Sequence, residues 1–431
     1  MTKAQVAPAF DLRPLLFAHM ACTIAMMAFV SLIGPIARVL QLAPWQAGAA
    51  MTVSGVIWML LARPWGRASD RYGRRRILLL GAGGFTLAYW ALCLFIDGAL
   101  RWLPPASIAF VGMMIGRGAI GAFYAALPVG SNALIADNVE PANRAKAMAS
   151  LGAANAVGLV LGPALAALLA RFSLSLPMYA LAILPLLALL VLRHKLVRQE
   201  LHLAQPPRPV RLSDPRLRRP LAVAFVAMLC VSLAQITVGF FALDRLGLEP
   251  GAAAQAAGIA LTMVGVALIF SQLLVRKLQW PPLRMIRVGA CVGALGFVVS
   301  AFAVDSLMLS AGFFICAGGM GWIFPAFAAL AANAVEASEQ GATAGSIGAM
   351  QGLGVVIGPL AGTLIYSLDA RLPWLVAAGL LLLIGLWTTS KEQQGNPAPT
   401  HPRRVCFNAS PIFSSQHQGG YGHGDTTQTG A

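Results

Sequence analysis

Long, continuous apolar runs dominate the chain, and short polar segments separate them. Twelve runs are long enough to cross the roughly 30 Å hydrocarbon layer of a bilayer as helices, which takes about 20 residues each. Their expected bounds are 15–37, 46–64, 77–97, 106–136, 145–170, 175–192, 220–243, 252–275, 285–304, 307–332, 341–367 and 373–390. Apolar residues follow one another without alternation, so the runs predict helices rather than the strands of a membrane barrel.

One polar segment divides these runs into two sets of six. Residues 193–219 are rich in Arg and Pro and lie between the sixth and seventh runs. We therefore expect a six-helix half over residues 1–192, a central loop over 193–219 and a second six-helix half over 220–390. Residues 391–431 are mainly polar and small, which predicts a disordered tail.

The two halves carry a related sequence. Residues 137–163 (DNVEPANRAKAMASLGAANAVGLVLGP) and 333–359 (NAVEASEQGATAGSIGAMQGLGVVIGP) match at a constant offset. The matched pairs are Glu140 and Glu336, Ser150 and Ser346, Gly152 and Gly348, Gly158 and Gly354, Gly162 and Gly358, and Pro163 and Pro359. Such repeats form pseudo-symmetric halves with a substrate site between them near the bilayer midplane.

Composition agrees with a membrane protein and narrows the possible partners. The chain is 58% hydrophobic and 11% charged, whereas soluble domains are about 25% charged. A net charge of +16 would suit nucleic acid only if the basic residues formed one face. They instead separate apolar runs, so we expect no nucleic-acid partner. The six cysteines lack ligand spacing, and neither a metal site nor a cofactor is expected.

The basic residues also predict the orientation in the membrane. Most lie in the terminal segments or in loops on the side of the N-terminus, and five of the six loops on the other side have one each: Arg38, Arg101, Arg171, Arg245 and Arg371. Cytoplasmic loops retain positive charge, so both termini are expected in the cytoplasm of a cell with this protein in its inner membrane. The first run spans and lacks a small-residue cleavage site, which indicates a retained helix rather than a signal peptide.

The segment GRASDRYGRRR, residues 66–76, concentrates charge between the second and third runs. Its arginines favour the cytoplasmic side and anionic headgroups. Gly66 and Gly73 permit a tight turn and a close approach of two helices. Asp70 makes charge-assisted hydrogen bonds to arginine or faces the positive N-terminal end of a neighbouring helix.

Three motifs in their expected places resemble the major facilitator superfamily. The charged segment resembles that family's loop motif G-x-x-x-D-R-x-G-R-[KR]-[KR], and Arg117 with Gly121 partly resembles the R-x-x-x-G pattern of its fourth helix. Gly158-x-x-x-Gly162-Pro163 resembles the fifth-helix motif of the antiporter branch. Over residues 10–390 the chain thus resembles twelve-helix drug:proton antiporters.

This resemblance implies an all-α integral membrane protein that works as a monomer by alternating access. It also implies proton-coupled efflux of small apolar or amphipathic molecules, whereas an importer, a symporter or a facilitative carrier of the same fold remains open. For the charged segment it implies a latch that stabilises the outward-facing state. The alternative is a topology signal; the latch residues are Gly66, Asp70, Arg71, Gly73 and Arg74.

Polar residues at span depth are candidates for the substrate cavity. Arg117 lies near the middle of the fourth run, where an arginine is costly and faces the protein interior or water. It binds an anionic substrate group, biases a proton site, or locks helices by donating to backbone carbonyls. The other cavity candidates are Tyr124, Asn155, Gln235, Gln351 and Trp322. Asn155 and Gln351 are repeat-related, and either face each other across the cavity or bind neighbouring helices.

The fifth and eleventh runs share one pattern of small residues. Asn155, Gly158 and Gly162 fall on one helical face, as do the repeat-related Gln351, Gly354 and Gly358. Glycines on one face let membrane helices approach closely. Pro163 and Pro359 each remove a backbone donor and favour a bend. This pattern predicts helix packing and, through the resemblance, the antiporter motif.

Energy coupling has to come from an ion gradient. No G-x-x-x-x-G-K-[ST], H-E-x-x-H or G-x-S-x-G motif occurs, so neither an ATP-driven pump nor an enzyme is expected. All fifteen acidic residues lie in loops, tails or span ends. Asp97, near the outer side, ranks just ahead of His19, near the inner side, as a proton carrier. The alternatives are a solvated helix end for Asp97 and a side chain that snorkels to the interface for His19.

Overall fold

A computed structural model describes residues 10–196, 214–278, 280–336 and 339–387. These residues form helices and no strand, which confirms the predicted all-α fold. The helices are α1 (Arg13–Val39), α2 (Pro44–Tyr72), α3 (Arg74–Trp102), α4 (Ala106–Tyr124), α5 (Ala126–Asn138), α6 (Pro141–Ala170), α7 (Leu176–Lys195), α8 (Arg218–Asp244), α9 (Pro250–Leu278), α10 (Pro282–Ala301), α11 (Ser306–Asn333), α12 (Gln340–Tyr366) and α13 (Leu372–Trp387). The expected tail 391–431 and most of the expected central loop lie outside the described residues.

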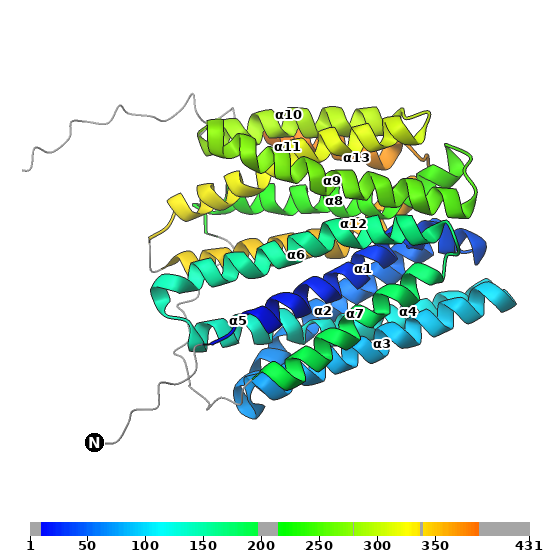
Figure 1. Ribbon diagram of the computed structural model, residues 1–431. Coiled ribbons are helices and arrows are strands. Elements are labelled where there is room, and N and C mark those ends of the chain that lie inside the picture. The colour runs from blue at the N-terminus through cyan, green and yellow to red at the C-terminus, as the bar shows by residue number, and fades with distance from the viewer. Residues whose placement is uncertain (1–9, 197–213, 279, 337–338, 388–431) are drawn as a thin grey trace, which may run out of the picture.

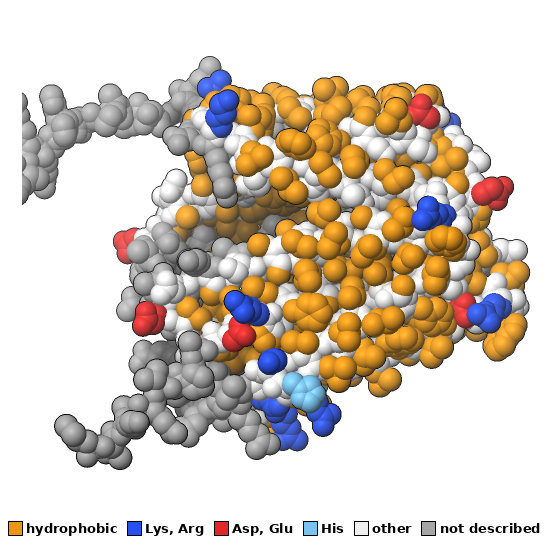
Figure 2. All heavy atoms as spheres, viewed as in Figure 1, with side chains coloured by type: hydrophobic (Ala, Val, Ile, Leu, Met, Phe, Trp, Pro, Cys, Tyr) orange, Lys and Arg blue, Asp and Glu red, His pale blue; other side chains and the backbone are white. Residues whose placement is uncertain are grey.

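The described helices α1–α12 form eleven segments that are long and apolar enough to cross a membrane. Helices α4 and α5 together make one of these segments, Ala106–Asn138. The shorter apolar helix α13 follows them. Large side chains on the outside of the bundle include Leu87, Ile115, Leu273 and Leu383. Figure 2 shows that such apolar side chains cover the middle of the visible face, whereas charged groups gather toward its two ends. This distribution suits a surface in contact with lipid.

The fourth expected span differs from a continuous helix. It is interrupted at Ala125, between α4 and α5. Pro128 explains the break, because its ring clashes with the carbonyl four residues earlier, which is that of Tyr124. One turn before the break, the carbonyl of Ala122 accepts a hydrogen bond from the indole nitrogen of Trp65 at 2.7 Å. Neighbouring helices commonly satisfy backbone groups in this way where a membrane helix is broken.

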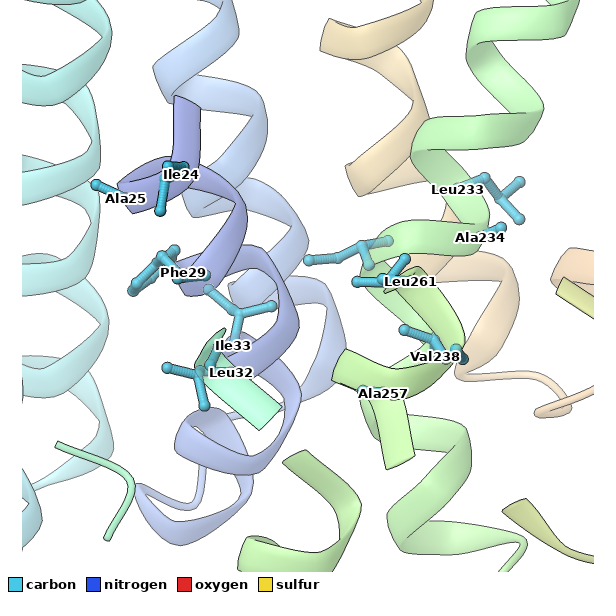
Figure 3. Packing of buried hydrophobic residues seen from close by; sticks show 14 of the residues in the cluster. Ile24, Ala25, Phe29, Leu32, Ile33, Leu233, Ala234, Val238, Ala257 and Leu261 are labelled. Atoms are coloured by element: carbon cyan, nitrogen blue, oxygen red, sulfur yellow. The ribbon is translucent and has the colours of Figure 1, made fainter. Parts of the chain in front are cut away.

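Helices α1–α7 and α8–α13 form two halves that lie side by side (Figure 1). Contacts of α6 with α9, of α2 with α12 and of α1 with α8 and α9 join them. Figure 3 shows buried side chains of α1 on one side and of α8 and α9 on the other. All of them belong to one hydrophobic cluster that includes residues of both halves.

The two ends of the bundle differ in how closely the halves approach. We name them the Arg38 face, where α1 ends, and the Arg74 face, where α3 begins. Near the Arg38 face a Cβ atom added to Gly34 of α1 would lie 2.8 Å from the carbonyl carbon of Gly239 of α8. Toward the Arg74 face a Cβ on Gly152 or Gly348 would meet nothing within 4 Å. Figure 2 shows a hollow between the halves on that side, so the protein is open at the Arg74 face.

Candidate functional site

Two polar residues one turn apart on α1 bind two other helices of the first half. The Nε2 atom of His19 lies 3.0 Å from the hydroxyl of Ser131 on α5. These side chains are only 5% and 1% exposed. The hydroxyl of Thr23, four residues after His19, donates a hydrogen bond to Oδ1 of Asn155 on α6 at 2.6 Å. His19 is therefore a buried group between helices and does not snorkel to an interface.

Tyr124 extends this arrangement to a fourth helix. Its side chain hydrogen-bonds with Thr23, and its ring lies 5.7 Å from that of Phe85 on α3. As the last residue of α4, it stands directly at the break that Pro128 explains. His19, Thr23, Tyr124, Ser131 and Asn155 together form what we call the α1 polar cluster.

Three members of this cluster were expected from the sequence as site residues, and two were not. Tyr124 and Asn155 were expected in a substrate cavity and His19 in a proton path, without a connection between them. Thr23 joins them, and its four-residue spacing from His19 was a usable signal because such residues share a helical face. Ser131 had no comparable signal, since single hydroxyl residues are frequent at membrane-helix contacts.

Arg117 is buried inside the first half with only 2% of its surface exposed. Its guanidinium carbon lies 5.0 Å from the centre of the Phe29 ring. Tyr89, whose hydroxyl donates to the carbonyl of Ala25 at 2.7 Å, is an electrostatic neighbour. The Nε and Nη1 atoms of Arg117 find no hydrogen-bond partner among the described residues. Those two nitrogens therefore do not lock the helix to backbone carbonyls.

An unpaired cation at this depth has an energetic consequence. A buried charge without a partner costs several kcal/mol. No carboxylate is among the described neighbours of Arg117, whose guanidinium lies over the ring of Phe29 and has Tyr89 as an electrostatic neighbour. Attraction between the guanidinium and an aromatic face offsets only about 2 kcal/mol of that penalty.

The cavity candidates of the second half do not form a comparable cluster in the described part of the chain. Gln235 on α8 and Gln351 on α12 are partly buried. Trp322 on α11 packs edge to face on Trp280, with 5.6 Å between ring centres. It shares a small apolar pocket with Val275, Leu278 and Met285, which belong to α9 and α10. The structure thus brings Tyr124 and Asn155 together through Thr23, whereas Arg117 and the candidates of the second half lie apart from them.

The glycines of α6 and α12 make equivalent contacts in the two halves. Added Cβ atoms on Gly158 and Gly162 would each lie 2.6 Å from an atom of α1, namely Cβ of Thr23 and the carbonyl oxygen of Ile24. On Gly354 the added atom would lie 2.8 Å from the backbone nitrogen of Leu229 on α8. Glycine is therefore needed where α6 meets α1 and where α12 meets α8.

The prolines of the same motif lie near the opposite half. A Cβ added to Gly258 of α9 would approach the carbonyl oxygen of Pro163 to 2.7 Å. The carbonyl of Pro359 accepts from the hydroxyl of Thr363 at 2.8 Å. Near it, Thr52 of α2 donates to the carbonyl of Val356 at 2.7 Å. Helices α6 and α12 thus contact a helix of their own half and a helix of the other half.

The charged segment at the Arg74 face binds within the first half. Arg74 pairs with Asp70, which is half exposed, and donates from Nε to Asp137 at the end of α5 over 2.9 Å. Gly73 has a φ of 93° between α2 and α3, a conformation that glycine adopts readily. Arg71 lies over the ring of its neighbour Tyr72. Asp137 was not expected as a partner of Arg74, because in the sequence it is an ordinary loop carboxylate.

Two further arginines form hydrogen bonds between segments at the Arg74 face. Arg75 donates to the carbonyl oxygens of Arg193 and Leu196 at the end of α7, over 2.8 and 2.6 Å. Cations favour the C-terminal end of a helix. In the second half Arg216 binds both Asp214 and Glu339, and these hydrogen bonds lower the pKa of each carboxyl group. Residues before α8 and before α12 are joined by this contact.

Asp97 lies near the Arg38 face on α3, separate from the α1 polar cluster. It forms an ion pair with Arg101 at 2.8 Å and hydrogen-bonds with Tyr179 of α7. Both partners belong to the first half. Among the described residues, no three His, Cys, Asp or Glu side chains are placed to hold a metal ion.

Comparison with known proteins gives one consistent result. The profile of the Major Facilitator Superfamily matches residues 15–348 and 306–416. The chain is 29% identical over 359 residues to the tetracycline resistance protein, class C, of Escherichia coli, covering 78% of this chain and 85% of that protein. It is 26% identical over 370 residues to multidrug resistance protein 2 of Bacillus subtilis (strain 168), covering 81% and 86%.

A solved structure shares the fold. A bacterial homologue of the human lysosomal transporter Spinster, in an inward-facing and unoccupied conformation, superposes with a TM-score of 0.70 and 14% identity. The match covers 88% of this chain and 95% of that one. The helical spans, the repeat and the profile match agree with one another: the chain belongs to the major facilitator superfamily and is an integral membrane transporter of small molecules, not an enzyme.

Proposed function

We propose that the protein exports small apolar or amphipathic molecules in exchange for protons. The observation that carries this proposal is the α1 polar cluster, a buried and mostly uncharged set of hydrogen-bonding groups that includes one histidine. Asn155, a member of the cluster, lies one helical turn from Gly152, which faces open space. The cluster is therefore close to the hollow through which a substrate enters.

The charge distribution supports an uncharged or amphipathic substrate. The twelve described acidic residues lie in the connections between helices or within the terminal two turns of a helix. A lipophilic cation would lack a carboxylate near the cluster, and desolvating it without one is unfavourable. Apolar walls with a few polar groups suit molecules that bind through hydrophobic area and are oriented by hydrogen bonds. The names of the relatives, tetracycline resistance and multidrug resistance, agree with export of such compounds.

The Arg74 face is proposed to be cytoplasmic, so that the open hollow faces the cytoplasm. It holds Arg71, Arg75, Arg76, Arg193 and Lys195, and this enrichment follows the positive-inside rule. Reporter domains fused after Leu103 and after Ser173 should therefore be active only outside the cytoplasm, and one fused at Pro206 only inside. Paired alkaline phosphatase and green fluorescent protein fusions measure this. Phosphatase activity at Pro206 would reverse the orientation.

His19 is the proposed proton carrier, and Asp97 is the second candidate. We rank His19 first, the reverse of the order expected from the sequence, because it lies inside the polar cluster whereas Asp97 is paired with Arg101 on the α3–α7 side. A neutral histidine accepts and releases protons near physiological pH when its surroundings change. The hydrogen bond to Ser131 gives it a partner that donates or accepts as required.

Transport in sealed everted vesicles tests this assignment. We expect uptake of neutral amphipathic dyes to require a proton gradient and an uncoupler to stop it. His19→Gln should remove gradient-driven accumulation and preserve downhill exchange, because glutamine still hydrogen-bonds but does not carry a proton. Asp97→Asn, measured in parallel, should keep accumulation. Accumulation by the His19 variant would transfer the role to another group, and uptake that ignores every gradient would indicate a facilitative carrier.

A further inference from the structure

Three side chains meet at the Arg38 face, each at the end of a different helix. Arg38, in the last turn of α1, pairs with Asp244, the last residue of α8. Tyr366, the last residue of α12, donates its hydroxyl proton to Oδ2 of the same carboxylate at 2.9 Å. The two oxygens of Asp244 are therefore bound by different halves of the protein, since Arg38 belongs to the first half and Tyr366 to the second.

The ion pair between Arg38 and Asp244 joins the first half of the protein to the second. Every other ion pair between described residues stays within the first half or joins segments beside α8 and α12: Arg74 with Asp70 and Asp137, Arg101 with Asp97, and Arg216 with Asp214 and Glu339. The hydrogen bond from Thr52 to the carbonyl of Val356 also crosses between the halves, but it has no charge. Asp244 thus links the relative position of the halves to an electrostatic interaction.

The surroundings of the Arg38–Asp244 pair explain why it contributes to the contact between α1 and α8. Next to it, α1 and α8 approach each other closely at Gly34 and Gly239, two residues without side chains. Apolar contact between membrane helices gives little net stabilisation, because lipid competes for the same surfaces. A charge-assisted contact is directional and stronger than a neutral one. It therefore contributes selectively to the conformation in which α1 and α8 are in register.

We propose that Arg38, Asp244 and Tyr366 form a gate that closes the Arg38 face and stabilises the conformation open at the Arg74 face. The inference rests on alternating access, in which the halves rock about the central site. When the Arg38 face opens, α1 and α8 separate, and the Arg38–Asp244 pair breaks. The gate therefore sets part of the equilibrium between the two conformations, independently of which substrate or ion is transported.

Distance measurement between spin labels across the Arg38 face tests the gate. Trp102 in the first half and Val304 in the second are both strongly exposed there and accept labels. Cys291, which is exposed, and Cys406, which lies outside the described residues, are replaced by serine, and the other four cysteines, which are buried, are kept. In Arg38→Gln and Asp244→Asn we expect the ratio of long to short label distances to rise roughly fivefold, the effect of a partly exposed ion pair. Tyr366→Phe should give a smaller rise.

Matched controls separate the gate from a general loss of charge. Arg171→Gln and Asp369→Asn remove the same charges from the same face at residues whose described contacts stay within their own half. Both controls should keep the parent distances. The exchanged variant Arg38→Asp with Asp244→Arg should return the distances toward those of the parent.

Two outcomes would overturn the gate: unchanged distances in both single variants, or failure of the exchanged variant to restore the parent distribution. Because the measurement needs neither substrate nor gradient, it stands apart from the export proposal. A protein that transports in the other direction, or without protons, would still show the gate.

Discussion

Arg117→Leu is expected to abolish transport and to leave the folded protein at least as stable as the parent. The reason lies in the position of the guanidinium, which is 2% exposed, packed on Phe29, and without hydrogen-bond partners for Nε and Nη1 within the described structure. A buried charge in that situation costs several kcal/mol. A protein that retains it against this penalty uses the charge in another state of its cycle, when a substrate or a rearranged helix approaches.

Thermal unfolding in detergent and transport in vesicles, measured on the same preparations, check this expectation. Leucine keeps an apolar side chain at this position and removes the uncompensated charge together with the guanidinium that packs on Phe29. Arg117→Lys is the companion variant, because it keeps the charge and loses the planar donor geometry. Partial transport in the lysine variant would indicate that charge is the essential property. A leucine variant that unfolds at a much lower temperature would instead assign Arg117 a structural role.

Much of the fold follows from the one-dimensional pattern. Continuous apolar runs predicted the helices because a bilayer leaves the backbone few alternatives. The break at Ala125 was the main departure in the described spans. Pro128 lies in the last third of the run 106–136, and the run was nevertheless expected to be one helix. Prolines also occur inside α1, α6 and α12, where the helix continues, so proline by itself does not predict a break.

The site was less accessible from sequence because its contacts join distant segments. His19 and Ser131, or Thr23 and Asn155, are more than a hundred residues apart, and only packing brings them together. The conformation of the protein is a second reason why these contacts could not be predicted from the sequence. In the sequence, Asp244 is an acidic residue at the end of a span, where it would be in contact with solvent. Its pairing with Arg38 exists because the Arg38 face is closed in this structure. A sequence that supports two conformations does not specify which contacts are present in either one.

Glycine-to-alanine substitutions along α6 and α12 are expected to change stability with opposite signs, depending on the position within one helix. At Gly162 an added Cβ would lie 2.6 Å from the carbonyl oxygen of Ile24, and at Gly358 it would lie 2.6 Å from Cβ of Ser232. These distances are too short for a methyl group, so α1 or α8 must move. Overpacking of this kind lowers the free energy of unfolding by about 1–3 kcal/mol.

Gly152 and Gly348 are the matched controls, since they lie on the same two helices and at repeat-related positions but face open space. Alanine there meets no neighbour and should raise the stability of the helix by about 0.5–1 kcal/mol. Thermal unfolding of the four single variants measures the contrast. Equal effects at Gly162 and Gly152 would mean that the contact between α6 and α1 is looser than the structure shows. Because a Cβ on Gly152 or Gly348 meets no neighbour within 4 Å, bulkier Gly152→Leu and Gly348→Leu should reduce transport without loss of stability, since closing the Arg74 face brings α6 and α12 toward the opposite halves.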